Sequence, residues 1–169
     1  MRMWLKRTLF VGHPTVSAGF ADRSSFTSVS PEQALRRIRL TVSPKVAIVD
    51  DSSSIRYLVR LFIEAHTDWQ VCGEADDGEA GVSLVQQLKP DLLVLDLLMP
   101  VMNGFDAARK MVAVSPMTKI VLFTGHADEQ VLKEAYSVGI RAVLSKDADN
   151  ALQRLLAALH EANDTVHAP

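Results

Sequence analysis

The sequence is poor in cysteine: Cys72 is the only one among its 169 residues. A single cysteine excludes an intramolecular disulfide framework and is typical of a protein from a reducing compartment. No Cys/His metal cluster can be built from it. The longest apolar stretch is interrupted by Asp96 and Pro100, so no run approaches the roughly 20 apolar residues that span a bilayer. We therefore expect a cytoplasmic protein without a membrane segment, in which a hydrophobic content of 48% is enough to build a full core.

The net charge of -2 conceals two parts of opposite sign. Residues 1–44 carry seven Lys or Arg and two acids, a net charge of +5, whereas the remainder carries -7. A Ser-rich run and Pro31 lie close to this change. We expect a basic, flexible extension over 1–44, a compact domain over 45–162 and a short tail over 163–169. A cap, proline and glutamine pattern predicts a short helix over 31–40, although a solvated arm is the favoured alternative.

The compact domain alternates apolar strands with amphipathic helices. Strands are predicted at Val46 to Val49, Trp69 to Ala75, Leu92 to Asp96, Ile120 to Phe123 and Ala142 to Leu144. Because each strand precedes a helix, right-handed crossovers favour an α/β fold: a doubly wound, five-stranded parallel sheet with helices on both faces. Five strands indicate the flavodoxin-like order 2-1-3-4-5, with the more polar second strand at an edge.

Capping residues and apolar periodicity delimit the helices. Ser52 to Ser54 can cap the first helix, Pro90 ends the second and Gly139 ends the fourth. Asp77-Gly78 is predicted to form a turn. The first helix is expected to turn one stripe toward the core, made of Ile55, Leu58, Val59 and Phe62.

Polar side chains follow four of the predicted strands, and together they form a candidate site. They are Asp50, Asp51, Asp96, Thr124 and Lys146. The carboxyl ends of parallel strands share one edge, where open α/β sheets bind ligands. Three neighbouring carboxylates repel unless a cation lies among them, and hard oxygen ligands suit Mg²⁺. Such a site could hold a phosphoryl group against a carboxylate nucleophile, for which Asp96 on the central strand is the best candidate. Alternatively, Asp96 only closes the turn after its strand.

Several stretches resemble the receiver domain of two-component response regulators. They are Val49-Asp50-Asp51 with Arg56, Glu74 to Ala80, Lys89 to Pro100 with Asn103-Gly104, Phe123-Thr124-Gly125, and Leu144 to Ala148. The match covers Lys45 to Glu161, and its Lys146-Asp147 ending is most similar to receivers of the NarL/FixJ, LuxR-type class. The resemblance thus supports the same α/β fold.

The resemblance also implies a role for each residue of the candidate site. Asp96 would accept a phosphoryl group from the phosphohistidine of a sensor histidine kinase or a phosphotransfer protein. Mg²⁺ or Mn²⁺ would be bound by Asp51, Asp96 and the backbone carbonyl of Leu98, with Asp50 completing the acidic pocket through water. Thr124 would bind the phosphoryl group, and Lys146 would pair with it.

Three departures from the family pattern are visible. Val143 stands where the family usually has a Tyr or Phe switch residue, three positions before the lysine. The usual Gly-Ala-x-Gly is replaced by the segment 139–142, at a face that many receivers use for partners. Leu98 and His126 occupy positions that flank the phosphoryl group, and Leu98 cannot hold a hydrolytic water, so slow autodephosphorylation is expected. His126 is expected to be a rim residue.

The sequence therefore predicts a single-domain response regulator that signals by conformational change to a downstream protein effector. Beyond self-phosphorylation and slow autodephosphorylation, no enzymatic activity is expected. Because the chain ends eight residues after Glu161, no effector domain is expected. Direct nucleic-acid and membrane binding are not expected, and a homodimer is left open. The alternatives are a phosphorylation-independent receiver-like interaction module and a flavodoxin-like or phosphatase enzyme.

Overall fold

The computed structural model describes residues 43–164. Five strands alternate with five helices over these residues: β1 (Lys45–Val49), α2 (Ser53–His66), β2 (Gln70–Ala75), α3 (Gly78–Leu88), β3 (Leu92–Leu95), α4 (Gly104–Val114), β4 (Lys119–Thr124), α5 (Glu129–Ser137), β5 (Ala142–Ser145) and α6 (Ala151–Asp164). Residues 1–42 of the predicted extension, with its helix over 31–40, and most of the predicted tail lie outside the described residues. Helix α6 continues two residues past position 162, where the domain is expected to end.

All five strands are parallel and form one sheet in the order β2-β1-β3-β4-β5. This order confirms the predicted doubly wound topology, and it places the more polar strand β2 at an edge as expected. The four residues of β3 are all buried, because helices cover both faces of the sheet at its centre. Strands β1 and β3 are neighbours, so their carboxyl ends meet at the topological switch point.

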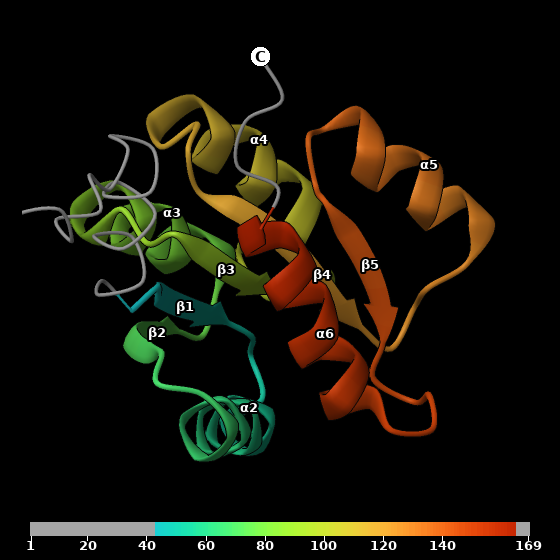
Figure 1. Ribbon diagram of the computed structural model, residues 1–169. Coiled ribbons are helices and arrows are strands. Elements are labelled where there is room, and N and C mark those ends of the chain that lie inside the picture. Colours follow the sequence, from blue (N-terminus) through green and yellow to red (C-terminus); the bar gives the residue numbers. More distant parts are fainter. Residues whose placement is uncertain (1–42, 165–169) are drawn as a thin grey trace, which may run out of the picture. The chain divides into compact units, whose positions relative to one another are not determined.

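Helices cover the two faces of the sheet unequally (Figure 1). Helices α2 and α6 lie on one face, and their buried residues, among them Ile63 and Leu159, pack against Ile48 and Val94 of the sheet. Helices α3, α4 and α5 cover the other face. There Met111 of α4 packs in a cluster with Val49 and other alternate strand residues. Two apolar layers therefore hold the strands whose ends carry the candidate site.

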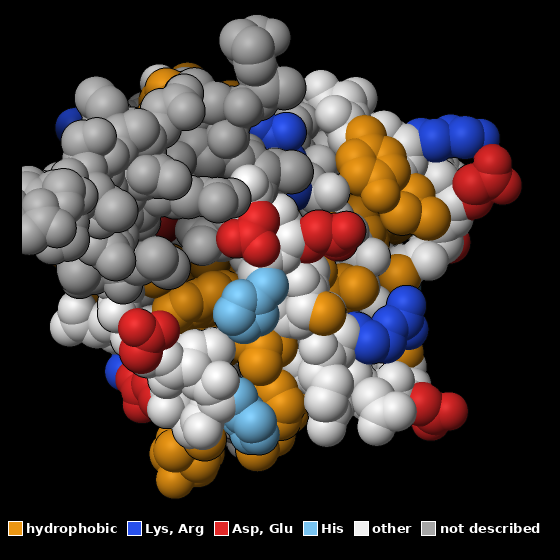
Figure 2. Space-filling view, in the orientation of Figure 1, with side chains coloured by type: hydrophobic (Ala, Val, Ile, Leu, Met, Phe, Trp, Pro, Cys, Tyr) orange, Lys and Arg blue, Asp and Glu red, His pale blue; other side chains and the backbone are white. Residues whose placement is uncertain are grey.

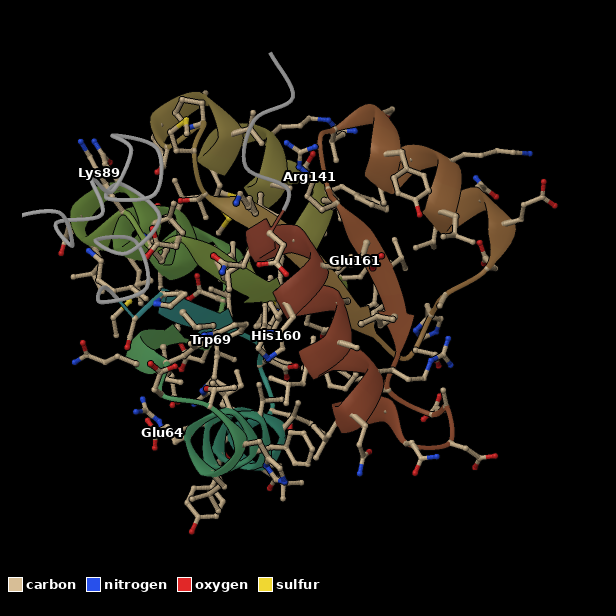
Figure 3. The ribbon with its side chains drawn as sticks, viewed as in Figure 1. Glu64, Trp69, Lys89, Arg141, His160 and Glu161 are labelled. Atoms are coloured by element: carbon tan, nitrogen blue, oxygen red, sulfur yellow. The ribbon has the colours of Figure 1, made fainter. Side chains whose placement is uncertain are left out.

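One ring contact secures α6 at the amino-terminal edge of the sheet. Trp69 directly precedes β2 and is buried, and its ring centroid lies 4.4 Å from that of His160 on α6. Figure 3 shows the two residues beside each other below the carboxyl-terminal half of α6. This contact lies at the edge opposite to the candidate site, because it adjoins the beginning of a strand rather than its end.

The predicted inward stripe of α2 is partly wrong. Val59 is buried, Ile55 and Phe62 are partly buried, but Leu58 is 49% exposed. Ile63 is the second fully buried residue of the helix, which shows that α2 is rotated so that the stripe passes through Val59 and Ile63. Hydrophobic side chains consequently reach the surface over α2, as Figure 2 shows.

The predicted helix boundaries are largely correct. Ser52 is the N-cap of α2, and its hydroxyl accepts a hydrogen bond from the Ile55 N–H. Gly139 follows α5 with φ at +89°, a conformation that glycine adopts without strain. The predicted Asp77-Gly78 turn is instead a helix start, because Asp77 caps α3 by accepting from the Ala80 N–H. Within the described residues, no helix is long and apolar enough to cross a membrane.

The rotation of α2 can be tested with two matched leucine-to-alanine variants. The buried reference is Leu159 on α6, which has no exposed surface. Leu159→Ala should lower the free energy of unfolding by about 3 kcal/mol through lost burial and a residual cavity. Leu58→Ala, on the exposed face of α2, should change it by about 0.5 kcal/mol or less. Urea unfolding followed by circular dichroism measures both, and a large loss in Leu58→Ala would contradict the observed orientation.

Candidate functional site

Three carboxylates converge where β1 and β3 end side by side. Asp50 and Asp51 follow β1 directly, and Asp96 follows β3. The ladder of these strands pairs Val49 with Leu95 and is extended by the Asp96 N–H, which donates to the Val49 carbonyl at 2.8 Å. One carboxylate oxygen from each of the three aspartates lies within 4.8 Å of the others. The structure thus brings together the acidic residues that the sequence placed at this edge.

Lys146 connects two of the three carboxylates. Its Nζ lies 2.7 Å from Asp50 Oδ2 and 3.1 Å from Asp96 Oδ1. Asp50 and Asp96 are 2% and 5% exposed, whereas Asp51 is exposed to solvent. The lysine follows β5, and its backbone N–H donates to the Thr124 carbonyl at 2.9 Å, which ties the ends of β4 and β5 together. The ammonium group is therefore the fixed counter-charge of a nearly buried carboxylate pair.

Burial raises the pKa of the Asp96 carboxyl above its ordinary value, and the negative charge of Asp50 raises it further. The Lys146 ammonium and a hydrogen bond from the Leu97 backbone act in the opposite direction but do not cancel the effect of burial. The ionised form of Asp96 is therefore less favoured than that of a free aspartate side chain, and a nearby cation would favour it.

The other residues singled out in the sequence lie on β4, on β5 and in the loop after β3. Thr124 ends β4 and is buried, and its hydroxyl accepts a hydrogen bond from the His126 N–H at 3.2 Å. Leu98, two residues after Asp96, has an exposed side chain. Val143 on β5 is half-buried and packs against the cluster beneath α3, α4 and α5. Among the hydrogen bonds of the described residues, none joins Thr124 or Leu98 to the three carboxylates, so the roles of both residues stay predictions.

Asp50 is held by more groups than the sequence indicated. Its N–H donates to the Ala75 carbonyl at 3.1 Å, and its Oδ1 accepts from the Ser52 N–H at 2.9 Å. Its carbonyl accepts a 2.6 Å hydrogen bond from an Arg56 terminal nitrogen. In the sequence Arg56 belongs to one of the stretches that carry the family resemblance, but no periodicity shows that its side chain turns back toward the preceding strand.

Gly104 lets helix α4 approach the Asp96 backbone closely. A Cβ atom at this position would overlap the Asp96 carbonyl oxygen and lie 2.9 Å from the Leu97 Cα. The Gly104 N–H donates to the Leu97 carbonyl at 2.8 Å, and Asn103 caps the helix. Any side chain at 104 would displace the turn that follows Asp96, which explains why glycine occupies this position.

The donor set fits a hard divalent cation. Asp50, Asp51 and Asp96 offer carboxylate oxygens only, the type of ligand that Mg²⁺ prefers, and the exposure of Asp51 leaves access for water. A cation bound among these oxygens would also favour the charged form of Asp96, whose pKa is raised by burial. Mn²⁺ takes similar oxygen ligands.

The fold and this edge define a class of protein: a parallel α/β domain with an acidic pocket and a lysine. The response regulator receiver domain family model matches residues 46–160, and the chain belongs to this family. Receiver domains are generally non-enzymatic signalling modules that bind Mg²⁺ at an acidic cluster and interact with histidine kinases and downstream effectors.

Individual relatives agree with the family assignment. The chain is 38% identical over 103 residues to the uncharacterised transcriptional regulatory protein YxjL of Bacillus subtilis, covering 61% of this chain and 47% of YxjL. It is 37% identical over 117 residues to the nitrate/nitrite response regulator NarL of Escherichia coli, covering 69% of this chain and 53% of NarL. The chain thus spans about half the length of these relatives.

A solved structure shows the same fold. The response regulator domain of Thermotoga maritima CheB superposes with a TM-score of 0.69 at 24% identity, over 75% of this chain and all of that one. At this level of identity the likeness concerns the fold, and it agrees with the observed strand order.

The raised pKa of Asp96 predicts a pH-dependent stability in the absence of divalent cations. Because the folded-state pKa exceeds the unfolded-state value, the unfolded carboxyl loses its proton first, and stability falls as the pH rises from the ordinary aspartate pKa to the raised one. Asp96→Asn removes this loss. We expect the variant to unfold at a higher temperature than the wild type at pH 7 without metal, with the difference shrinking toward pH 4. An Asp96→Asn protein that is less stable than the wild type at pH 7 would contradict a raised pKa of Asp96 in the folded state.

Proposed function

We propose that Asp96 is a phosphoacceptor that takes a phosphoryl group from a phosphohistidine of a sensor histidine kinase or a phosphotransfer protein. The observation that carries this proposal is the buried Asp96 carboxylate, bridged to Asp50 by one lysine Nζ. A carboxylate that ends a strand, lies beside two more acids and contacts a fixed ammonium group suits nucleophilic attack on phosphorus better than a structural turn.

The transfer forms one bond and breaks one. An Asp96 carboxylate oxygen attacks the phosphorus, the bond from phosphorus to the donor nitrogen breaks, and the electron pair returns to the donor imidazole. Mg²⁺ or Mn²⁺ would be bound by Asp51, Asp96 and the Leu98 carbonyl, and by Asp50 through a water molecule. The bound cation would neutralise charge on the phosphoryl oxygens. Lys146 contributes its ammonium to the same charge, and it already lies 3.1 Å from Asp96.

Signalling follows from a change in what Lys146 and Thr124 contact. The phosphoryl group of an acyl phosphate carries about -1.5 to -2 charges at neutral pH in place of the single charge of the Asp96 carboxylate, so the ammonium shared by Asp50 and Asp96 gains a more strongly charged partner. The Thr124 hydroxyl accepts a hydrogen bond from the His126 N–H in the loop after β4. When this loop moves, the hydroxyl becomes a donor to the phosphoryl group. Since the Lys146 N–H is bonded to the Thr124 carbonyl, the ends of β4 and β5 move together and present an altered surface to a downstream protein.

The protein is proposed to act in the cytoplasm as a receiver domain over 45–162, preceded by a basic extension.

A second candidate function is a receiver whose interactions are independent of phosphorylation. Val143 favours it, because a half-buried valine lacks the large rotatable ring of the usual aromatic switch residue. The complete set of Asp96, Thr124 and Lys146 favours the phosphorylated switch.

Incubation with Mg²⁺ and acetyl phosphate tests the proposal. The wild-type protein should gain the mass of one phosphate, measured by intact-protein mass spectrometry, and lose it at alkaline pH as an acyl phosphate does. Asp96→Asn should gain none, because the amide preserves the side-chain shape but is not a nucleophile. EDTA should suppress the reaction in the wild type.

Asp106→Asn is the matched control, since Asp106 is an exposed aspartate in the first turn of α4 that pairs with Arg109. It should be phosphorylated like the wild type. A labile phosphate on Asp96→Asn, or none on the wild type, would overturn the assignment of Asp96.

A further inference from the structure

The guanidinium of Arg56 makes two contacts, one with the backbone of Asp50 and one with Glu74 on strand β2. A terminal nitrogen donates to the Asp50 carbonyl at 2.6 Å, and Nε donates to Glu74 Oε2 at 3.2 Å. Arg56 lies in the first turn of α2 and is partly buried, with a side chain 16% exposed. The guanidinium therefore links two neighbouring strands, since Glu74 lies on β2 and Asp50 directly follows β1.

The carbonyl that Arg56 holds belongs to the peptide unit between Asp50 and Asp51. A peptide unit is planar, so fixing the direction of its carbonyl fixes the plane from which the Asp51 Cα atom continues. The Asp50 side is already fixed, because its N–H is bonded to the Ala75 carbonyl and its carboxylate to Lys146. The Arg56 contact therefore restricts the remaining freedom of Asp51, whose side chain is exposed to solvent.

We propose that Arg56 is a positioning residue for the divalent cation: it orients the Asp50–Asp51 peptide so that the Asp51 carboxylate faces the same point as that of Asp96. Glu74 supports it by holding the guanidinium in place through Nε. This inference rests on the metal site of the proposed function and assigns to Arg56 a role that involves no contact with the metal.

The charge of Arg56 makes the direction of the effect informative. A cationic side chain near three carboxylates repels a second cation. If this repulsion were the only effect of Arg56, removing its charge would strengthen Mg²⁺ binding. The loss of orientation has the opposite effect and weakens binding. A substitution that removes the charge consequently separates the two explanations by the sign of the change.

Arg60 offers a matched control on the same helix. Its Nε lies 2.6 Å from Glu74 Oε1, so it shares the acidic partner of Arg56, and a terminal nitrogen lies 3.3 Å from Glu64 Oε1. Glu64 is labelled on α2 in Figure 3. These contacts involve side chains alone, whereas Arg56 also reaches the Asp50 backbone. Arg60→Met thus removes the same charge and the same carboxylate pairing without releasing the Asp50 carbonyl.

The experiment is a Mg²⁺ titration of the wild type, Arg56→Met, Arg56→Lys and Arg60→Met, followed by ¹H–¹⁵N NMR at a temperature where thermal unfolding shows each to be folded. Removing a partner that orients a metal ligand typically weakens binding by 10- to 100-fold, so we expect Arg56→Met to raise the Mg²⁺ dissociation constant by about tenfold. Arg56→Lys should weaken binding less, because an ammonium keeps the charge but lacks the planar fork. Arg60→Met should stay within about twofold of the wild type.

Each outcome decides the role of Arg56. Wild-type or tighter Mg²⁺ binding by Arg56→Met would overturn the positioning role, as would equal weakening by Arg60→Met. A purely structural role would lower the melting temperature of Arg56→Met without changing the affinity of the folded protein. If the wild type itself shows no Mg²⁺ binding, the metal site of the proposed function fails, which is a different result from an unaffected variant.

Discussion

The site depends on one ammonium group shared by two nearly buried carboxylates. Lys146 Nζ contacts both Asp50 and Asp96, and neither carboxylate has more than 5% of its residue surface exposed. Burial of two like charges side by side is unfavourable, and the lysine compensates only in part, since the pKa of Asp96 remains raised. An added cation would therefore stabilise the ionised form of these carboxylates.

The strand order of the fold brings Asp50, Asp96 and Lys146 together. Strands β1 and β3 are neighbours at the switch point, which brings Asp50 and Asp96 together, and β5 delivers Lys146 from the far side of β4. Two apolar layers fix the strands, so the strand ends have little freedom to relax away from one another. Gly104 and Arg56 then adjust the two acidic turns, one by allowing close approach and the other by holding a carbonyl.

The sequence predicted the strand order and the site edge because both depend on where apolar runs stop. It did not predict how helices are rotated: α2 has more apolar residues than it buries, and only packing decides that Ile63 faces the core while Leu58 faces solvent. For the same reason the contact of Arg56 with the Asp50 carbonyl was not predictable, since it depends on the position of the first turn of α2 relative to the end of β1.

The most direct test of the shared lysine is the free energy of unfolding of Lys146→Met at neutral pH, measured by urea titration with and without Mg²⁺. Removing one partner of a buried ion pair leaves charge uncompensated, so we predict a loss of about 3 kcal/mol without metal and a smaller loss with Mg²⁺, which supplies a cation to the same carboxylates. Lys133→Met, which breaks an exposed pair with Glu129, should cost about 0.5 kcal/mol or less. A Lys146→Met protein as stable as the wild type without metal would contradict the account.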